Sequence, residues 1–105
     1  MKMTKRDMPE TMYRASRCCR VLGNPTAYLI VRALDAGRKT PSQLSQELQI
    51  PLPTVSVTLR HLREIDMVRY IAAGSSKEYW VKDRMAMRVL DLLERLVDKM
   101  RSKQV

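Results

Sequence analysis

The sequence predicts a mainly α-helical fold with one β-hairpin, and two stretches carry this prediction. Residues 41 to 65 hold two short amphipathic segments around a tight turn, with apolar residues three and four apart as on one helix face. Between residues 68 and 82, two runs rich in Tyr, Trp, Val and Ile flank Gly74, Ser75 and Ser76, which is typical of a hairpin. A helix pair followed by a hairpin is a winged helix-turn-helix, with about five helices and a two-stranded wing.

Two helices are expected before the helix-turn-helix. Pro9 opens the first, over residues 9 to 22, and a glycine follows its end. Asn24 is expected to cap the second helix, because Pro25 then takes the first helical position, where its missing N–H costs nothing. Both predicted helices carry an apolar stripe and therefore belong to the same folded unit.

The start of the helix-turn-helix has a distinct local signature. Thr40, Pro41 and Gln43 combine an N-cap hydroxyl, a first-turn proline and the third-position amide of a capping box. Ser45 stands where two helices that cross steeply need a small side chain. These residues predict that a helix begins at position 41 and packs closely against the next one.

The last helix, expected over residues 84 to 101 after Asp83, has a wide apolar face. Its two adjacent stripes are Ala86, Leu90, Leu93, Val97 and Met100, and Met85, Val89, Leu92 and Leu96. A terminal helix of a small domain needs only one stripe against its own core, so the other is expected to meet a partner subunit. We predict one winged-helix domain over residues 1 to 105, with the helix-turn-helix at 41 to 65 and the wing at 68 to 82.

The composition favours an anionic partner. The chain has 20 Lys and Arg against 11 Asp and Glu, a formal net charge of +9, which points to phosphates or anionic membranes. No apolar run approaches the roughly 18 residues of a spanning helix, and the first residues lack an apolar signal core, so we expect a soluble, cytoplasmic protein with no membrane partner. Lys2, Lys5 and Arg6 either extend across phosphates as an arm or remain solvated.

The second helix of the pair offers an outer face suited to DNA bases. The candidate contact residues on it are Pro53, Thr54, Ser56, Val57, Thr58 and Arg60. With Val55 pointing inward, a step of about 100° per residue places most of them outward or on the flanks. Thr54 and Ser56 can hydrogen-bond base edges or phosphates, and Val57 can pack on a thymine methyl. The alternative interpretation is an ordinary solvated helix face.

The tip of the predicted wing supplies a second candidate contact. Ser75, Ser76 and Lys77 lie at or beside the turn, where a cation can meet the backbone or the minor groove of flanking DNA. The alternative is a polar hairpin turn without a partner.

Cys18 and Cys19 are the only candidates for a thiol switch. A vicinal thiol pair can bind a soft metal or arsenite, or oxidise across two subunits. Arsenite prefers three thiolates and zinc four ligands, so two subunits would have to combine their pairs. Cys19 also lies on an apolar stripe, and packing as small hydrophobic residues is the favoured role. His61 and Glu64 are too few for a metal site, and we expect no metal and no cofactor.

The order of elements and two sequence stretches resemble the ArsR/SmtB family of winged-helix repressors over about residues 12 to 82. VLGNPTAYLIVRAL at 21 to 34 is similar to that family's entry to the second helix, and LPTVSVTLRHLREIDMV at 52 to 68 to its recognition helix and wing entry. The resemblance implies a homodimer built on the first and last helices. It also implies sequence-specific binding to an operator in double-stranded DNA and repression of transcription.

The chain departs from the family where metals are sensed. Metal-responsive members place cysteines near the start of the helix that begins here at Pro41, or Asp and His on the last helix. Here the first region contains no Cys, and the last helix contains neither His nor Cys, so the usual ligands are missing and no effector can be named. Val57 and Thr58 stand where many relatives have Arg and His, so a different operator is expected.

An enzyme is not expected, because the sequence has no Ser-His-Asp set, metal cluster or Gly-rich phosphate loop. The alternative from another class is a winged-helix protein-protein interaction module. The response to salt separates the two, since DNA binding releases counterions and weakens steeply as salt is added.

Overall fold

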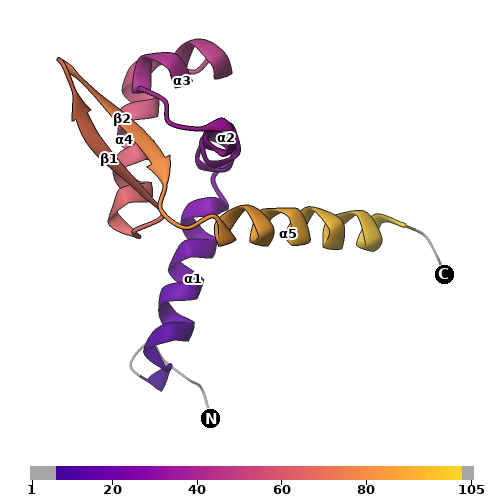
Figure 1. Ribbon diagram of the computed structural model, residues 1–105. Helices are drawn as coiled ribbons and strands as arrows, with labels where there is room; N and C mark the ends of the chain where they lie inside the picture. Colours follow the sequence, from indigo (N-terminus) through magenta and orange to yellow (C-terminus); the bar gives the residue numbers. More distant parts are fainter. Residues whose placement is uncertain (1–6, 103–105) are drawn as a thin grey trace.

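The computed structural model describes residues 7–102 and has the predicted order of elements (Figure 1). The elements are α1 (Glu10–Leu22), α2 (Pro25–Ala33), the 3₁₀ turn η2 (Leu34–Ala36), α3 (Pro41–Leu48), α4 (Leu52–Glu64), β1 (Val68–Ala73), β2 (Ser76–Val81) and α5 (Met85–Arg101). Helices α2, α3 and α4 gather beside the hairpin, while α1 and α5 extend away from them in different directions (Figure 1). The predicted winged helix-turn-helix is confirmed.

Helices α2 and α3 begin at the capping residues that the sequence predicts. The Asn24 side chain accepts hydrogen bonds from the backbone N–H groups of Thr26 and Ala27 at 2.9 and 3.2 Å. At α3, the Thr40 hydroxyl accepts from the Gln43 N–H at 3.1 Å, and the Gln43 amide oxygen accepts from the Thr40 N–H at 2.8 Å. These bonds satisfy N–H groups that a helix start otherwise leaves without a partner, so both boundaries are fixed locally.

The turn of the helix-turn-helix is closed by Ser45 of α3. Its backbone carbonyl accepts from the Ile50 N–H at 3.1 Å, and its hydroxyl donates to the Ile50 carbonyl at 2.5 Å. Between them, Gln49 adopts a left-handed conformation with φ 56°. The small side chain predicted at position 45 therefore also ties the turn to α3.

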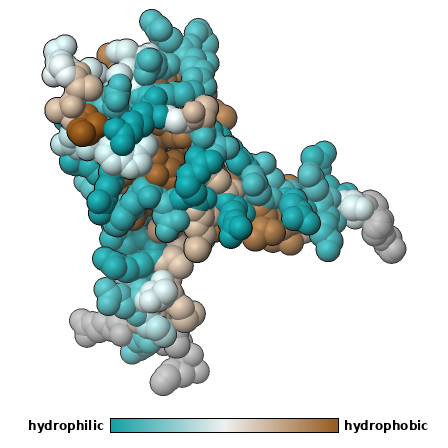
Figure 2. All heavy atoms as spheres, viewed as in Figure 1, coloured by the Kyte–Doolittle hydropathy of each residue, from teal (hydrophilic) through white to brown (hydrophobic). Residues whose placement is uncertain are grey.

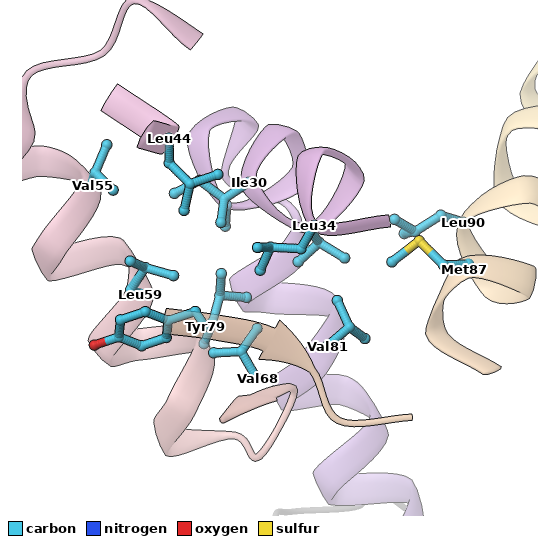
Figure 3. Close-up of a cluster of buried hydrophobic side chains, with 13 residues drawn as sticks. Ile30, Leu34, Leu44, Val55, Leu59, Val68, Tyr79, Val81, Met87 and Leu90 are labelled. Atoms are coloured by element: carbon cyan, nitrogen blue, oxygen red, sulfur yellow. The ribbon is translucent and has the colours of Figure 1, made fainter. Parts of the chain in front are cut away.

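The core lies between the helix-turn-helix, α2, the base of the hairpin and the start of α5 (Figure 3). Its buried apolar side chains are Ala27, Ile30, Val31, Leu34, Leu44, Val55, Leu59, Leu62, Val68, Tyr79, Val81, Met87 and Leu90. Because α4 contributes three of these, its inward face is fixed and its opposite face is left to solvent.

The wing is a two-stranded antiparallel hairpin with Tyr70 opposite Tyr79 and Ala73 opposite Ser76. Its turn is Gly74-Ser75, with Gly74 at φ 65°, so β2 begins at Ser76 and not at Lys77 as the sequence suggested. A two-residue hairpin turn needs positive φ at its first central position, which glycine provides without strain.

Helices α1 and α5 leave apolar surface without a partner in the chain. No residue of α1 is buried, and on α5 only Met87 and Leu90 are. The exposed apolar side chains of the two helices are Met12, Met85, Val89, Leu92, Leu93, Leu96, Val97 and Met100. Figure 2 shows apolar surface along α5. Within residues 7–102, no helix has both the length and the apolar character needed to cross a membrane.

Candidate nucleic-acid interface

The structure gathers the candidate contact residues of α4 on one exposed side. Pro53, Thr54, Ser56, Val57 and Arg60 are all exposed, while the inward stripe of the same helix is buried. Val57 is 43% exposed although it is apolar. The helix thus presents hydroxyls, a methyl-bearing side chain and one cation, a mixture able to contact base edges and phosphates.

Thr58 does not belong to this exposed face, and its inclusion among the contact residues needs correction. Its side chain is 8% exposed, and its hydroxyl donates to the Thr54 carbonyl at 2.7 Å. A hydroxyl bonded back to the preceding turn satisfies a buried polar group inside the helix. Thr58 therefore supports the helix, and we remove it from the contact set.

The wing tip is exposed as predicted. Ser75, Ser76 and Lys77 all face solvent at or beside the turn. The Lys77 ammonium lies 4.6 Å from the centre of the Tyr70 ring, so this cation is held against the hairpin and does not extend freely. The opposite face of the hairpin carries Trp80, over which the Arg38 guanidinium lies 4.3 Å from the ring centre.

Arg63 is a basic residue near the interface that the sequence reasoning missed. Its guanidinium lies 5.2 Å from the centre of the Tyr70 ring, and Nη1 donates to the Tyr70 hydroxyl at 3.3 Å. Ser56, Arg60 and Arg63 are spaced four and three apart, so they share one side of α4. Extending that flank by one turn would have brought Arg63 into the predicted set.

The base of the wing is fixed by an ion cluster around Asp66, at the turn after α4. Its carboxylate pairs with Lys82 and lies 3.7 Å from Arg69 Nε. The hydrogen bond from Lys82 is the main cause that lowers the pKa of Asp66. The cluster joins the turn after α4 to β1 and to the residue that follows β2, so the wing is anchored beside α4.

A groove of about 590 Å³ borders the contact face of α4 on the side toward α1 and α2. Its lining residues are Arg20, Val21, Asn24, Ala27, Pro53, Thr54, Val57, Thr58 and His61. Neither a cysteine nor an acidic residue lines this groove beside His61. In the part of the chain from 7 to 102, no three His, Cys, Asp or Glu residues come together as they would around a metal ion.

The two cysteines are not packed inside their own chain. Cys18 is half-buried, and Cys19 is exposed on the apolar side of α1 that Met12 shares. The packing role expected for Cys19 therefore requires a second subunit. Lys2, Lys5 and Arg6, the predicted arm, lie outside the described residues.

A family model described as a helix-turn-helix domain matches residues 22–71, which include the helix-turn-helix and most of β1. No curated protein gives a significant match to the sequence. Many solved structures do match the fold.

Three solved structures illustrate the similarity. The homodimeric winged helix-turn-helix DNA-binding domain (fragment 1-100) of Mb0332 from Mycobacterium bovis, a possible ArsR-family transcriptional regulator, has a TM-score of 0.79 and 17% identity, covering 91% of each chain. The transcriptional repressor BigR from Xylella fastidiosa has a TM-score of 0.75 and 24% identity, over 90% of this chain and 96% of that one. HlyU from Vibrio cholerae has a TM-score of 0.75 and 20% identity, over 85% and 97%.

The helix-turn-helix match and the similarity to these solved structures confirm the winged-helix fold that the resemblance in the sequence implied. The chain contains a helix-turn-helix domain and has the winged-helix fold of the ArsR-family transcriptional regulators.

Proposed function

We propose that the chain is a sequence-specific DNA-binding transcriptional regulator that acts as a homodimeric repressor. The observation that carries this proposal is the first two turns of the outer face of α4, where Thr54, Ser56 and Val57 are exposed beside Arg60, and the acidic Glu64 lies one turn beyond them at the end of the helix. The start of the helix can therefore enter a major groove without bringing a carboxylate to the phosphates, and it offers distinct contacts to the bases. The contact set proposed is Pro53, Thr54, Ser56, Val57 and Arg60 on α4, with Ser75, Ser76 and Lys77 on the wing.

The dimer in this proposal is built on α1 and α5. Their exposed apolar side chains include Met12, Leu92 and Leu96, which are 55%, 60% and 52% exposed in the single chain. Exposed apolar side chains of this number on a basic protein mark a protein interface rather than a nucleic-acid contact. Two subunits related by a two-fold axis would place their recognition helices in successive major grooves, about 34–36 Å apart.

The proposed function is tested by fluorescence anisotropy with labelled duplex DNA. The reduced protein is titrated into DNA from upstream of its own gene and into a scrambled duplex of the same length, at several salt concentrations. We expect tighter binding to the upstream duplex, with an affinity that falls steeply as salt is added. Weak and equal binding to both duplexes leads to selection of a binding site from random DNA. Failure to enrich any sequence would contradict the proposal.

The same titration separates DNA binding from a thiol switch. Repeating it with oxidant, with arsenite, and with a Cys18→Ser, Cys19→Ser variant shows whether the thiols change DNA affinity. An effect lost in the variant would add a sensing role to the proposed regulator, and no effect would leave the thiols a packing role in the dimer.

A further inference from the structure

Two cations of different elements lie over one aromatic ring at the junction of α4 and the wing. The Arg63 guanidinium and the Lys77 ammonium lie 5.2 and 4.6 Å from the centre of the Tyr70 ring. Tyr70 is half-buried, and its ring centre lies 5.2 Å from that of the buried Tyr79. We call Arg63, Tyr70 and Lys77 the Tyr70 cluster. Because Tyr79 belongs to the core, the cluster has a fixed position relative to the fold.

The two cations of the Tyr70 cluster have no acidic partner among residues 7–102, unlike several neighbouring cations. Arg69 pairs with Asp66 on the other face of the same hairpin, and Lys39 pairs with Glu47. Two like charges held near one ring repel each other, and the ring quadrupole offsets only part of this cost. A bound anion would remove the repulsion, so the arrangement favours a negatively charged ligand.

The position of the cluster points to the kind of anion. Arg63 continues the flank of α4 that carries Ser56 and Arg60. Lys77 lies opposite Ala72 in the hairpin and on the same face as Tyr70 and Tyr79, since residues two apart in a strand share a face. The cluster therefore lies between the base-contacting face of the recognition helix and the tip of the wing. DNA that touches both must pass its backbone beside it.

We propose that Arg63 and Lys77 bind backbone phosphates of the DNA next to the bases contacted by α4, and that Tyr70 is the positioning residue that holds both cations there. This inference rests on the proposed DNA-binding function. It assigns a phosphate contact to Arg63. It also implies that Lys77 of the wing reaches its phosphate only when the Tyr70 ring holds it in place.

The test measures DNA affinity against salt for Arg63→Gln and Lys77→Gln, with Arg69→Gln as the matched control. Each phosphate contact contributes about 0.9 to the slope of log affinity against log salt, so a dimer that loses one contact per subunit loses about 1.8. Between 50 and 200 mM salt, the ratio of variant to wild-type dissociation constants should then shrink about tenfold. Arg69→Gln removes the same charge from the opposite face of the hairpin and should keep the wild-type slope.

The positioning role of Tyr70 is tested separately by ethylation interference, which identifies the phosphates that the protein contacts. Tyr70→Leu should abolish interference at the phosphates lost in Arg63→Gln and Lys77→Gln, and should leave interference at the remaining phosphates unchanged. Tyr70→Phe keeps the ring and should retain the Lys77-dependent phosphate. Thermal unfolding followed by circular dichroism confirms that each variant is folded at the temperature of the assay.

The outcomes distinguish this inference from the proposed function. If the wild-type protein selects no DNA sequence, the proposed function fails and the inference fails with it. If the wild type binds DNA specifically but Arg63→Gln and Lys77→Gln keep the same slope as Arg69→Gln, only the Tyr70 cluster is overturned. An unchanged interference pattern in Tyr70→Leu would show that the ring does not position the cations.

Discussion

Arg32 of α2 binds Asp91 of α5, with Nη2 2.7 Å from Oδ1. The same guanidinium donates to Glu94 at 2.8 and 3.0 Å, and Glu94 also accepts from the Tyr28 hydroxyl at 2.6 Å. The side chain of Arg32 is 26% exposed, so this network is only partly open to solvent. It holds α5 against α2 at the point where the helix leaves the core, and so it orients the apolar face proposed to form the dimer.

The first prediction concerns the acid sensitivity of this network. The hydrogen bonds from Tyr28 and Arg32 lower the pKa of Glu94 below its ordinary value of 4.5. A carboxyl with a lowered pKa in the folded state stabilises that state above its ordinary pKa, and this contribution is lost as the pH falls through the lowered value. Melting temperatures of the wild type should therefore drop as the pH falls below about 4.5, and Glu94→Gln should show a shallower drop.

The control for this prediction is Glu78→Gln, which removes a carboxylate on β2 outside the network. The melting temperature of each protein is followed by circular dichroism from pH 7 to pH 3. Parallel curves for Glu94→Gln and the wild type would show that the network makes no contribution that depends on pH.

The second prediction separates two threonines of α4 that lie one turn apart. Thr54 is exposed on the proposed contact face, whereas the Thr58 hydroxyl is buried and bonded to the Thr54 carbonyl. Thr54→Val should weaken binding to the operator by about 1–3 kcal/mol if its hydroxyl contacts a base edge, with little change for scrambled DNA. Thr58→Val should leave both affinities unchanged, because the side chain keeps its volume and lies away from the DNA. Anisotropy titrations of both variants make the comparison, and a larger loss in Thr58→Val would restore it to the contact set.

Local hydrogen-bonding patterns explain why much of the fold could be predicted. The caps at Asn24 and Thr40 depend on residues within three positions, so the sequence alone identifies them. Thr58 was placed wrongly although the helical period points to its burial: at about 100° per residue it lies about 60° from the inward Val55, on the same side as Leu59 and Leu62. Its position within the groove beside α1 and α2 comes only from the tertiary packing.

The Tyr70 cluster at the candidate site could not be predicted from the sequence. Arg63 and Lys77 are far apart in sequence, and each by itself is an ordinary surface cation. Only the register of the hairpin and its packing against α4 bring both to one ring. The exposed face of α4, in contrast, follows from the spacing of its buried residues and was largely correct.

The third prediction concerns the turn of the helix-turn-helix. Gln49 adopts a left-handed conformation, which costs a non-glycine residue roughly 1 kcal/mol. Its side-chain amide donates to the Gln46 carbonyl at 2.8 Å, which recovers part of that cost. Gln49→Gly should stabilise the protein by up to about 1 kcal/mol, measured by urea denaturation. Gln46→Gly, in the regular part of α3, should destabilise it by about 1 kcal/mol. Destabilisation of similar size in both variants would show that the turn is not strained at Gln49.

The last prediction tests the dimer through Leu92, which is 60% exposed on the apolar face of α5. In the proposed homodimer, Leu92→Glu would bury an unpaired carboxylate in each subunit. Leaving a buried charge without a partner costs about 3–5 kcal/mol, so the dimer dissociation constant should rise at least about 100-fold. Arg95→Glu introduces the same side chain on the polar side of α5 and should leave the dimer intact. Sedimentation equilibrium of both variants gives the association state directly. Because each half-site alone is bound weakly, Leu92→Glu should also lose operator affinity, and a variant that remains dimeric would place the interface elsewhere on the molecule.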